Sequence, residues 1–131
     1  MREIVTNSPD ETEAEGEELG RRLRPGDLIL LTGPLGAGKT TFVRGLARGA
    51  GSEAQVASPT FQLVRIYPGR VQLAQVDLYG VKTAGELADL GIDELIDEGA
   101  VVVEWGDRIE AKTGRQITFE TLGGDRRRIR M

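Results

Sequence analysis

The sequence contains no cysteine and no histidine. Without these residue types the chain has no thiol nucleophile, no disulfide, no zinc finger and no Ser-His-Asp triad. Any acid–base chemistry therefore falls to Asp, Glu or Lys. The absence of cysteine also fits a reducing compartment. Because no signal peptide and no membrane-spanning segment is visible, we expect a soluble cytoplasmic protein without membrane contact.

The chain is also short, and its net charge is not positive. Its 131 residues predict a single domain over 1–131, with little room for a lid, so we expect a partner to supply part of the function. The net charge of −4 does not match a nucleic-acid footprint. Segment 83–99 is acidic and the C-terminal segment is rich in arginine. These segments are either solvated surfaces or docking surfaces for a protein or an RNA.

What the sequence does contain is a complete phosphate-binding loop. Residues 33–40 read Gly-Pro-Leu-Gly-Ala-Gly-Lys-Thr and match G-x-x-x-x-G-K-[ST]. The apolar run 28–31 before the loop is typical of a buried parallel strand, and apolar residues follow over 41–48 at helical spacing. The motif requires this context of strand, loop and helix. The alternative is a glycine-rich turn that binds no ligand.

Each part of this loop has a role in holding phosphate. The glycines let successive backbone N–H groups point at phosphate oxygens, and the helix that begins here adds its positive dipole end. We expect Lys39 to reach the β- and γ-phosphates and the Thr40 hydroxyl to ligate Mg²⁺. The loop residues predicted to contact the nucleotide are Leu35, Gly36, Ala37, Gly38, Lys39, Thr40 and Thr41.

Two acidic residues at predicted strand ends are candidates for the catalytic centre. Glu104 follows the apolar run 100–103, and Asp77 ends the alternating segment 71–77. In open α/β sheets the carboxyl ends of strands face the ligand crevice. We therefore expect Glu104 and Asp77 to hold Mg²⁺ or its waters and to orient the attacking water, with Lys39 as the third catalytic residue. The alternative is that both acids are ordinary turn or cap residues.

Two further residues are candidates for nucleotide contact. Thr60 lies in a region that often carries a γ-phosphate-sensing hydroxyl in P-loop proteins. Its segment, Ser58-Pro59-Thr60, is equally compatible with an ordinary turn. Trp105 is the only tryptophan and directly follows Glu104. It either covers the nucleotide or packs at the sheet edge.

A GTPase is an alternative that the sequence itself tests. Residues 77–80 match the D-x-x-G of a GTPase switch. GTPases of that class read guanine with N-K-x-D. The only asparagine, Asn7, lies before the phosphate loop and is not followed by lysine. The guanine-reading motif is missing, and we interpret the D-x-x-G match as accidental.

The pattern of apolar residues and turns predicts an α/β fold with a mixed β-sheet flanked by helices. Ser8 and Pro9 are typical of a helix start. Strands are predicted at 4–5, 28–31, 61–67, 71–77, 100–103, 117–122 and 127–129. Helices are predicted from Ser8 to about Leu23, from the phosphate loop to about Ala50, over 83–98 with a break near Gly91, and over 107–112.

This set of motifs resembles that of the TsaE family, whose members are small bacterial P-loop ATPases of tRNA modification. The phosphate loop with Thr41 is followed by Ser58-Pro59-Thr60-Phe61, Asp77-Leu78-Tyr79 and Val103-Glu104-Trp105, in the order and spacing of that family. Many families share the phosphate loop alone, whereas the combination is specific. The resemblance covers nearly the whole chain, to about Arg108.

This resemblance implies a P-loop NTPase-like fold and a part in making N6-threonylcarbamoyladenosine in tRNA. Members of the family hydrolyse ATP with Mg²⁺ but do not transfer the threonylcarbamoyl group. They bind a heterodimer of TsaB and the transferase TsaD, so tRNA is reached indirectly through the complex. By position, Lys39 and Thr40 would hold the phosphates and Mg²⁺. Asp77 and Glu104 would be the essential acids, and 58–61 a switch-like loop.

The chain departs from the family pattern in three places. The family often has His two residues before the D-L-Y aspartate, where this chain has Gln75. It commonly has Arg after D-L-Y and Thr after S-P-T-F, where this chain has Gly80 and Gln62. The contribution of these positions to nucleotide or partner contact is therefore open in this chain.

Two other functions use the same residues. A free-standing small-molecule P-loop kinase needs an acceptor site and usually arginine-bearing lid segments, and segment 83–99 has no arginine. A nucleotide-binding scaffold without hydrolysis has no need of Glu104 and Asp77. We therefore expect an ATPase that acts with TsaB and TsaD.

Overall fold

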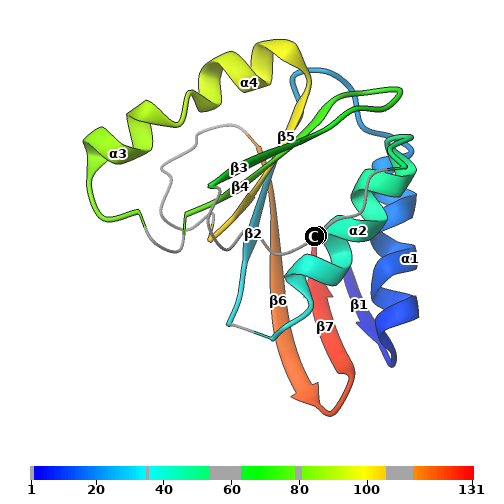
Figure 1. Ribbon diagram of the computed structural model, residues 1–131. Helices are drawn as coiled ribbons and strands as arrows, with labels where there is room; N and C mark the ends of the chain where they lie inside the picture. The colour runs from blue at the N-terminus through cyan, green and yellow to red at the C-terminus, as the bar shows by residue number, and fades with distance from the viewer. Residues whose placement is uncertain (1, 35, 54–62, 79–80, 106–113) are drawn as a thin grey trace.

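The computed structural model describes residues 2–34, 36–53, 63–78, 81–105 and 114–131. They form a mixed β-sheet with helices on both faces (Figure 1). The strands are β1 (Glu3–Thr6), β2 (Leu28–Thr32), β3 (Val64–Tyr67), β4 (Leu73–Asp77), β5 (Ala100–Glu104), β6 (Arg115–Gly123) and β7 (Arg126–Arg130). The helices are α1 (Pro9–Gly20), α2 (Lys39–Gly49), α3 (Ala84–Asp89) and α4 (Ile92–Glu98). None of these helices has the length and apolar character needed to cross a bilayer.

The strand order places the phosphate-loop strand in the middle of the sheet. The order is β1-β7-β6-β2-β5-β4-β3. β2 pairs in parallel with β5 and β6, and β5 pairs in parallel with β4. β3 is antiparallel to β4 at one edge, and β7 and β1 form antiparallel pairs at the other. The carboxyl ends of β2, β5 and β4 therefore share one edge of the sheet, where ligands bind in folds of this kind.

One face of the sheet is covered by α1 and α2, which lie side by side (Figure 1). Ser8 caps α1 by accepting a hydrogen bond from the backbone N–H of Glu11 at 3.2 Å. A Cβ atom at Gly16 would collide with the backbone of α2, and one at Gly45 would collide with the backbone of α1. The two helices therefore pack backbone against backbone. This contact holds α2, and the phosphate loop that precedes it, against the sheet.

The other face is covered by α3 and α4, which pack less closely. Neither helix contains a buried residue. The two are separated at Gly91, whose φ of 69° favours glycine. Their apolar side chains are partly buried against a cluster on β2, β4 and β5; they are Leu87, Leu90, Ile92, Leu95 and Ile96.

The predicted α/β class with a mixed, helix-flanked sheet is confirmed. Several element bounds differ from the prediction. The helix α1 ends at Gly20 and not near Leu23, β4 begins at Leu73 and not at residue 71, and β6 begins at Arg115 and not at residue 117. Apolar and polar residues largely alternate over 71–77, but buried and exposed side chains do not. β4 is buried from Leu73 to Val76, because it lies between β3 and β5 and is covered on both faces. The predicted helix at 107–112 lies outside the described residues.

Candidate nucleotide site

The candidate site lies where three strands end. The phosphate loop follows β2, Glu104 is the last residue of β5, and Asp77 is the last residue of β4. In the register of the sheet, Glu104 is the neighbour of Leu31 on one side and of Asp77 on the other. The structure therefore brings both predicted acids next to each other and beside the loop.

The backbone of the phosphate loop has the shape that its glycines were predicted to allow. Gly36 and Gly38 have φ values of 76° and 97°, which side chains with a Cβ rarely adopt. Gly38 is the N-cap of α2 and provides no side-chain cap. The first backbone N–H groups of α2 therefore remain for an anion, as at other helix N-termini that bind phosphate. Thr41 lies in the first turn of α2.

Lys39 is held between the loop and an aromatic ring. Its side chain is buried, its Nζ donates a hydrogen bond to the carbonyl of Gly33 at 2.7 Å, and Nζ lies 3.6 Å from the centroid of the Trp105 ring. An ammonium group at this distance over an indole face is attracted by the ring. The predicted phosphate-binding cation is thus already placed beside the loop.

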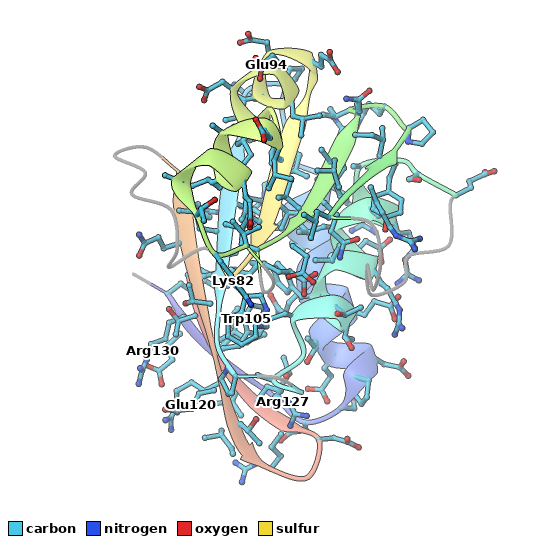
Figure 2. All side chains as sticks on the ribbon, turned by 60° about the vertical axis from the view of Figure 1, so that its left-hand side comes forward. Lys82, Glu94, Trp105, Glu120, Arg127 and Arg130 are labelled. Atoms are coloured by element: carbon cyan, nitrogen blue, oxygen red, sulfur yellow. The ribbon has the colours of Figure 1, made fainter. Side chains whose placement is uncertain are left out.

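Trp105, which makes this contact, has a strained backbone conformation. Its φ of 62° makes it the one residue other than glycine with a positive φ in the described ranges. For a bulky residue such a conformation costs about 1–3 kcal/mol and is typical of functional sites. Figure 2 labels Trp105 near the middle of the molecule, beside the ribbon of the phosphate loop. The side chain also packs against the β4–β5 cluster, so contact with Lys39 and packing at the sheet occur together.

Glu104 is buried and has a partner on each carboxylate oxygen. Its Oε1 lies 3.5 Å from the hydroxyl of Thr40, and its Oε2 accepts a hydrogen bond from Nε2 of Gln75 at 2.8 Å. Burial raises the pKa of Glu104 above its usual value, and the neighbouring charge of Asp77 acts in the same direction. The hydrogen bond from Gln75, the charge of Lys39 and the Thr40 hydroxyl oppose this rise. A carboxylate of raised pKa is a better proton acceptor for a water molecule.

The Thr40 hydroxyl and the two acids form a ligand set that suits Mg²⁺. Mg²⁺ in nucleotide sites is typically held by one or two carboxylates, with phosphate and water oxygens completing the shell. In the described residues no group of three or more acidic, His or Cys side chains converges on one point. The donor set therefore resembles a site that is completed by the substrate, and not a preformed protein cage.

Sequence reasoning missed Tyr67 and the role of Gln75. Gln75 is fully buried, and its Oε1 accepts a hydrogen bond from the hydroxyl of Tyr67 at 2.7 Å. A signal was present in the sequence, because residues two apart on a strand face the same way and Gln75 precedes Asp77 by two. A lone amide among apolar neighbours on a buried strand needs a partner, and here Glu104 is one of them.

Arg127 on β7 is a second residue that sequence reasoning missed. Its Nη2 donates a hydrogen bond to the carbonyl of Gly36 at 2.9 Å, and its Nη1 donates one to the carbonyl of Gly124 at 2.6 Å. The C-terminal hairpin was predicted only as a pair of strands, and no local signal links it to a loop so far away in sequence. Figure 2 shows Arg127 below Trp105, whereas Glu120 and Arg130 lie further to the left in this view.

Two of the predicted nucleotide contacts, Leu35 and Thr60, lie outside the described residues. The arginines of the last strand are largely engaged within the protein. Arg128 forms ion pairs with Glu3 and Glu120, and Arg130 pairs with Glu3. These contacts favour the interpretation of the basic tail as a structural strand.

Comparison with known proteins identifies the family of this chain. The model of the family described as "Threonylcarbamoyl adenosine biosynthesis protein TsaE" matches residues 6–129. The chain belongs to the TsaE family. The resemblance seen in the motifs is thereby confirmed.

Individual TsaE relatives are similar over most of their length. A protein of Bacillus subtilis named tRNA threonylcarbamoyladenosine biosynthesis protein TsaE is 39% identical over 129 residues, which cover 95% of this chain and 80% of that protein. Its namesake in Streptomyces coelicolor is 43% identical over 122 residues, covering 87% and 76%. The crystal structure of Bacillus subtilis YdiB superimposes with a TM-score of 0.79 at 32% identity, covering 98% of this chain and 82% of that one.

Proposed function

We propose that this TsaE-family protein is the ATP-hydrolysing subunit of the machinery that makes N6-threonylcarbamoyladenosine in tRNA. Family membership supports the role in tRNA modification, since the similar proteins are named for this biosynthesis. One structural observation carries the assignment of hydrolysis. A buried carboxylate, Glu104, lies 3.5 Å from the Thr40 hydroxyl at the end of a complete phosphate loop.

In this proposal each side chain has a separate task. Lys39 leaves the carbonyl of Gly33 to neutralise the β- and γ-phosphates of ATP, while the first turn of α2 donates backbone N–H groups to them. Thr40, Asp77 and Glu104 hold Mg²⁺ or its waters. When bound, Mg²⁺ neutralises charge that develops on the phosphate oxygens. Glu104 also orients the attacking water, for which its raised pKa is suited.

Trp105 and the remaining loop residues would shape the nucleotide pocket. Nζ of Lys39 lies over the Trp105 ring. Trp105 would contact the nucleotide once Lys39 turns to the phosphates. Gly36, Ala37, Gly38 and Thr41 would contribute their backbone N–H groups. We include Leu35 and Thr60 among the proposed contacts on sequence grounds alone.

The proposed partners are TsaB and TsaD. The residues gathered at the strand ends serve phosphate chemistry, so we assign transfer of the threonylcarbamoyl group to TsaD and contact with tRNA to the complex. In this account residues 1–131 work as a single P-loop ATPase domain. We also propose a cytoplasmic location for this protein.

The test is the release of phosphate from ATP by the purified chain, with and without TsaB and TsaD. We expect Mg²⁺-dependent hydrolysis that rises when both partners are added, with no phosphorylated small molecule formed. Lys39→Ala should abolish it, because this variant lacks the cation nearest the transferred phosphoryl group. Appearance of a phosphorylated metabolite would identify a kinase instead. Nucleotide binding without hydrolysis under either condition would identify a scaffold.

A further inference from the structure

The buried pair Tyr67 and Gln75 has no task in the hydrolysis described above, yet it contacts the central acid. We propose that Tyr67 and Gln75 are positioning residues, which form a fixed hydrogen-bonded row that orients the Glu104 carboxylate toward Thr40. This inference rests on the proposed function, because it explains how the acid of that site is held in place.

The row runs diagonally across three neighbouring strands, because Tyr67 pairs with Leu73, two positions before Gln75, and Glu104 pairs with Asp77, two positions after it. Tyr67 lies on β3, Gln75 on β4 and Glu104 on β5. The hydroxyl of Tyr67 is 2.7 Å from Oε1 of Gln75, and Nε2 of Gln75 is 2.8 Å from Oε2 of Glu104. Gln75 has no exposed surface, and Tyr67 and Glu104 are 3% and 5% exposed. Water therefore has little access to replace either hydrogen bond.

The chemistry of the three side chains allows only one assignment of donors and acceptors to these two hydrogen bonds. An ionised carboxylate only accepts hydrogen bonds, so the Gln75 amide must turn its NH₂ group to Glu104. Its carbonyl oxygen then faces Tyr67, whose hydroxyl must donate. The two hydrogen bonds thus support each other, and the amide has no alternative orientation that satisfies both neighbours.

As a consequence, the two carboxylate oxygens of Glu104 have different partners. Gln75 occupies Oε2, which leaves Oε1 directed at the hydroxyl of Thr40 at 3.5 Å. Asp77, the neighbour of Glu104 in the sheet register, repels this carboxylate. Without the hydrogen bond from Gln75, the carboxylate would be free to turn away from Asp77. The site would then present its Mg²⁺-binding oxygen in several orientations and not in one.

Two variants remove the row at different points, and a third serves as a control. Gln75→Met keeps the length of the side chain but removes both polar atoms, and Tyr67→Phe removes only the terminal hydroxyl. The matched control is Leu23→Ala, which truncates a side chain of 2% exposure beside the carboxyl end of α1, away from the phosphate loop. It destabilises the fold but removes none of the hydrogen bonds of the row, and so it shows what loss of stability alone does to the site.

Two readouts separate positioning from general damage. The first is the split between kcat and KM for ATP hydrolysis in the presence of TsaB and TsaD. The second needs no turnover and follows the fluorescence of Trp105, the only tryptophan, as Mg²⁺ is added to protein with saturating ADP. Partners that orient metal ligands typically contribute 10–100-fold to metal affinity or activity.

We expect Gln75→Met to lower kcat by about 10–100-fold and to raise the half-saturating Mg²⁺ concentration, with KM for ATP nearly unchanged. Tyr67→Phe should shift both quantities in the same direction by about 3–10-fold, because the amide keeps its bond to Glu104. Leu23→Ala should leave both at the wild-type values below its unfolding temperature.

The inference is overturned if both row variants match Leu23→Ala in kcat and in Mg²⁺ dependence. If Gln75→Met does not fold, the test rests on Tyr67→Phe alone. A wild-type kcat and a wild-type Mg²⁺ dependence in Tyr67→Phe would then overturn the inference. Failure of the proposed function has a different signature. The wild-type protein would then release no phosphate, while the Mg²⁺ dependence of Trp105 fluorescence would still compare the variants.

Discussion

The two helical layers that cover the sheet differ in how closely they pack. On one face, α1 and α2 meet through glycine backbone, and the α2 side chains Phe42 and Leu46 are fully buried. On the other face, α3 and α4 contain no buried residue and contribute only partly covered apolar side chains. Figure 1 shows these layers on opposite sides of the sheet. We name them the tight layer (α1 and α2) and the loose layer (α3 and α4).

The candidate site has residues on both sides of this difference in packing. Lys39 and Thr40 belong to the tight layer, and alternation along β5 places Glu104 on the same face as Val102, which packs with that layer. Trp105 faces the other way and packs with the cluster under the loose layer. Weakly packed segments open at lower free energy than the core. We infer that the phosphate-binding half of the site is rigid, whereas the half that carries Trp105 adjusts to the ligand.

The largest expected difference in stability is between two variants that each add one methyl group, one in the tight layer and one in the loose layer. Gly45→Ala on α2 should lower the free energy of unfolding by about 3 kcal/mol or more, because the new Cβ meets the backbone of α1. Gly85→Ala on α3 is the matched control, since only Thr83 lies within reach, at 3.9 Å. It should raise stability by up to about 1 kcal/mol through helix propensity. Urea unfolding measures both, and equal effects would remove the distinction between the layers.

Truncating one leucine in each layer gives the next effect in size. Leu46→Ala should lower the free energy of unfolding by about 2–5 kcal/mol, because Leu46 is fully buried and leaves a cavity. Leu95→Ala in α4 should lower it by about 1 kcal/mol or less, because this side chain is only partly covered. Thermal unfolding of the two variants measures both losses of stability. A loss at Leu95 as large as that at Leu46 would show that the loose layer is as firmly packed as the tight one.

The acid that faces the tight layer should make stability depend on pH. Burial raises the pKa of Glu104 in the folded protein above its ordinary value of 4.5, so folding disfavours the ionised form. The wild type should therefore lose stability as the pH rises from about that value through the raised pKa. Glu104→Gln should be more stable than the wild type at neutral pH and equal to it in acid. Urea unfolding without Mg²⁺ at several pH values measures this, and a constant difference would contradict it.

The smallest effect is expected at the edge of the site, where β7 touches the phosphate loop. Arg127→Ala removes the hydrogen bond to the Gly36 carbonyl and should weaken ADP binding by about fivefold, or about 1 kcal/mol. Arg126→Ala, which changes an exposed neighbour of the same charge, is the control. Trp105 fluorescence measures both affinities. Equal weakening in the two variants would assign the effect to net charge and not to the loop contact.

The sequence predicted those parts of the site that depend on local pattern. The phosphate loop is a contiguous motif, and the position of Glu104 follows from an apolar run that ends in an acid. Contacts that depend on strand order were not predictable in this way. Arg127 meets Gly36 across 91 positions of sequence, and Gln75 meets Tyr67 and Glu104 only because β4 lies between β3 and β5.

The tight layer was also not visible in the sequence. Glycines such as Gly16 and Gly45 are poor helix formers, and their value becomes clear only when the opposite helix is in place. The start signals at Ser8 and Pro9 predicted α1, and the spacing of apolar residues predicted α2. The contacts between the two helices decide how closely they pack. The same limit applies to β4, which is buried from Leu73 to Val76 because it lies inside the sheet and both of its faces are covered.

The central claim is that Glu104 acts on a nucleotide held by the phosphate loop. Its most direct test is the rate of phosphate release from saturating MgATP by wild-type protein and Glu104→Gln, with TsaB and TsaD present and ATP binding followed by Trp105 fluorescence. We predict a fall in rate of about 100-fold or more with ATP still bound, because the variant keeps the phosphate loop but has no carboxylate to orient water. An unchanged rate in the folded, ATP-bound variant would contradict the account.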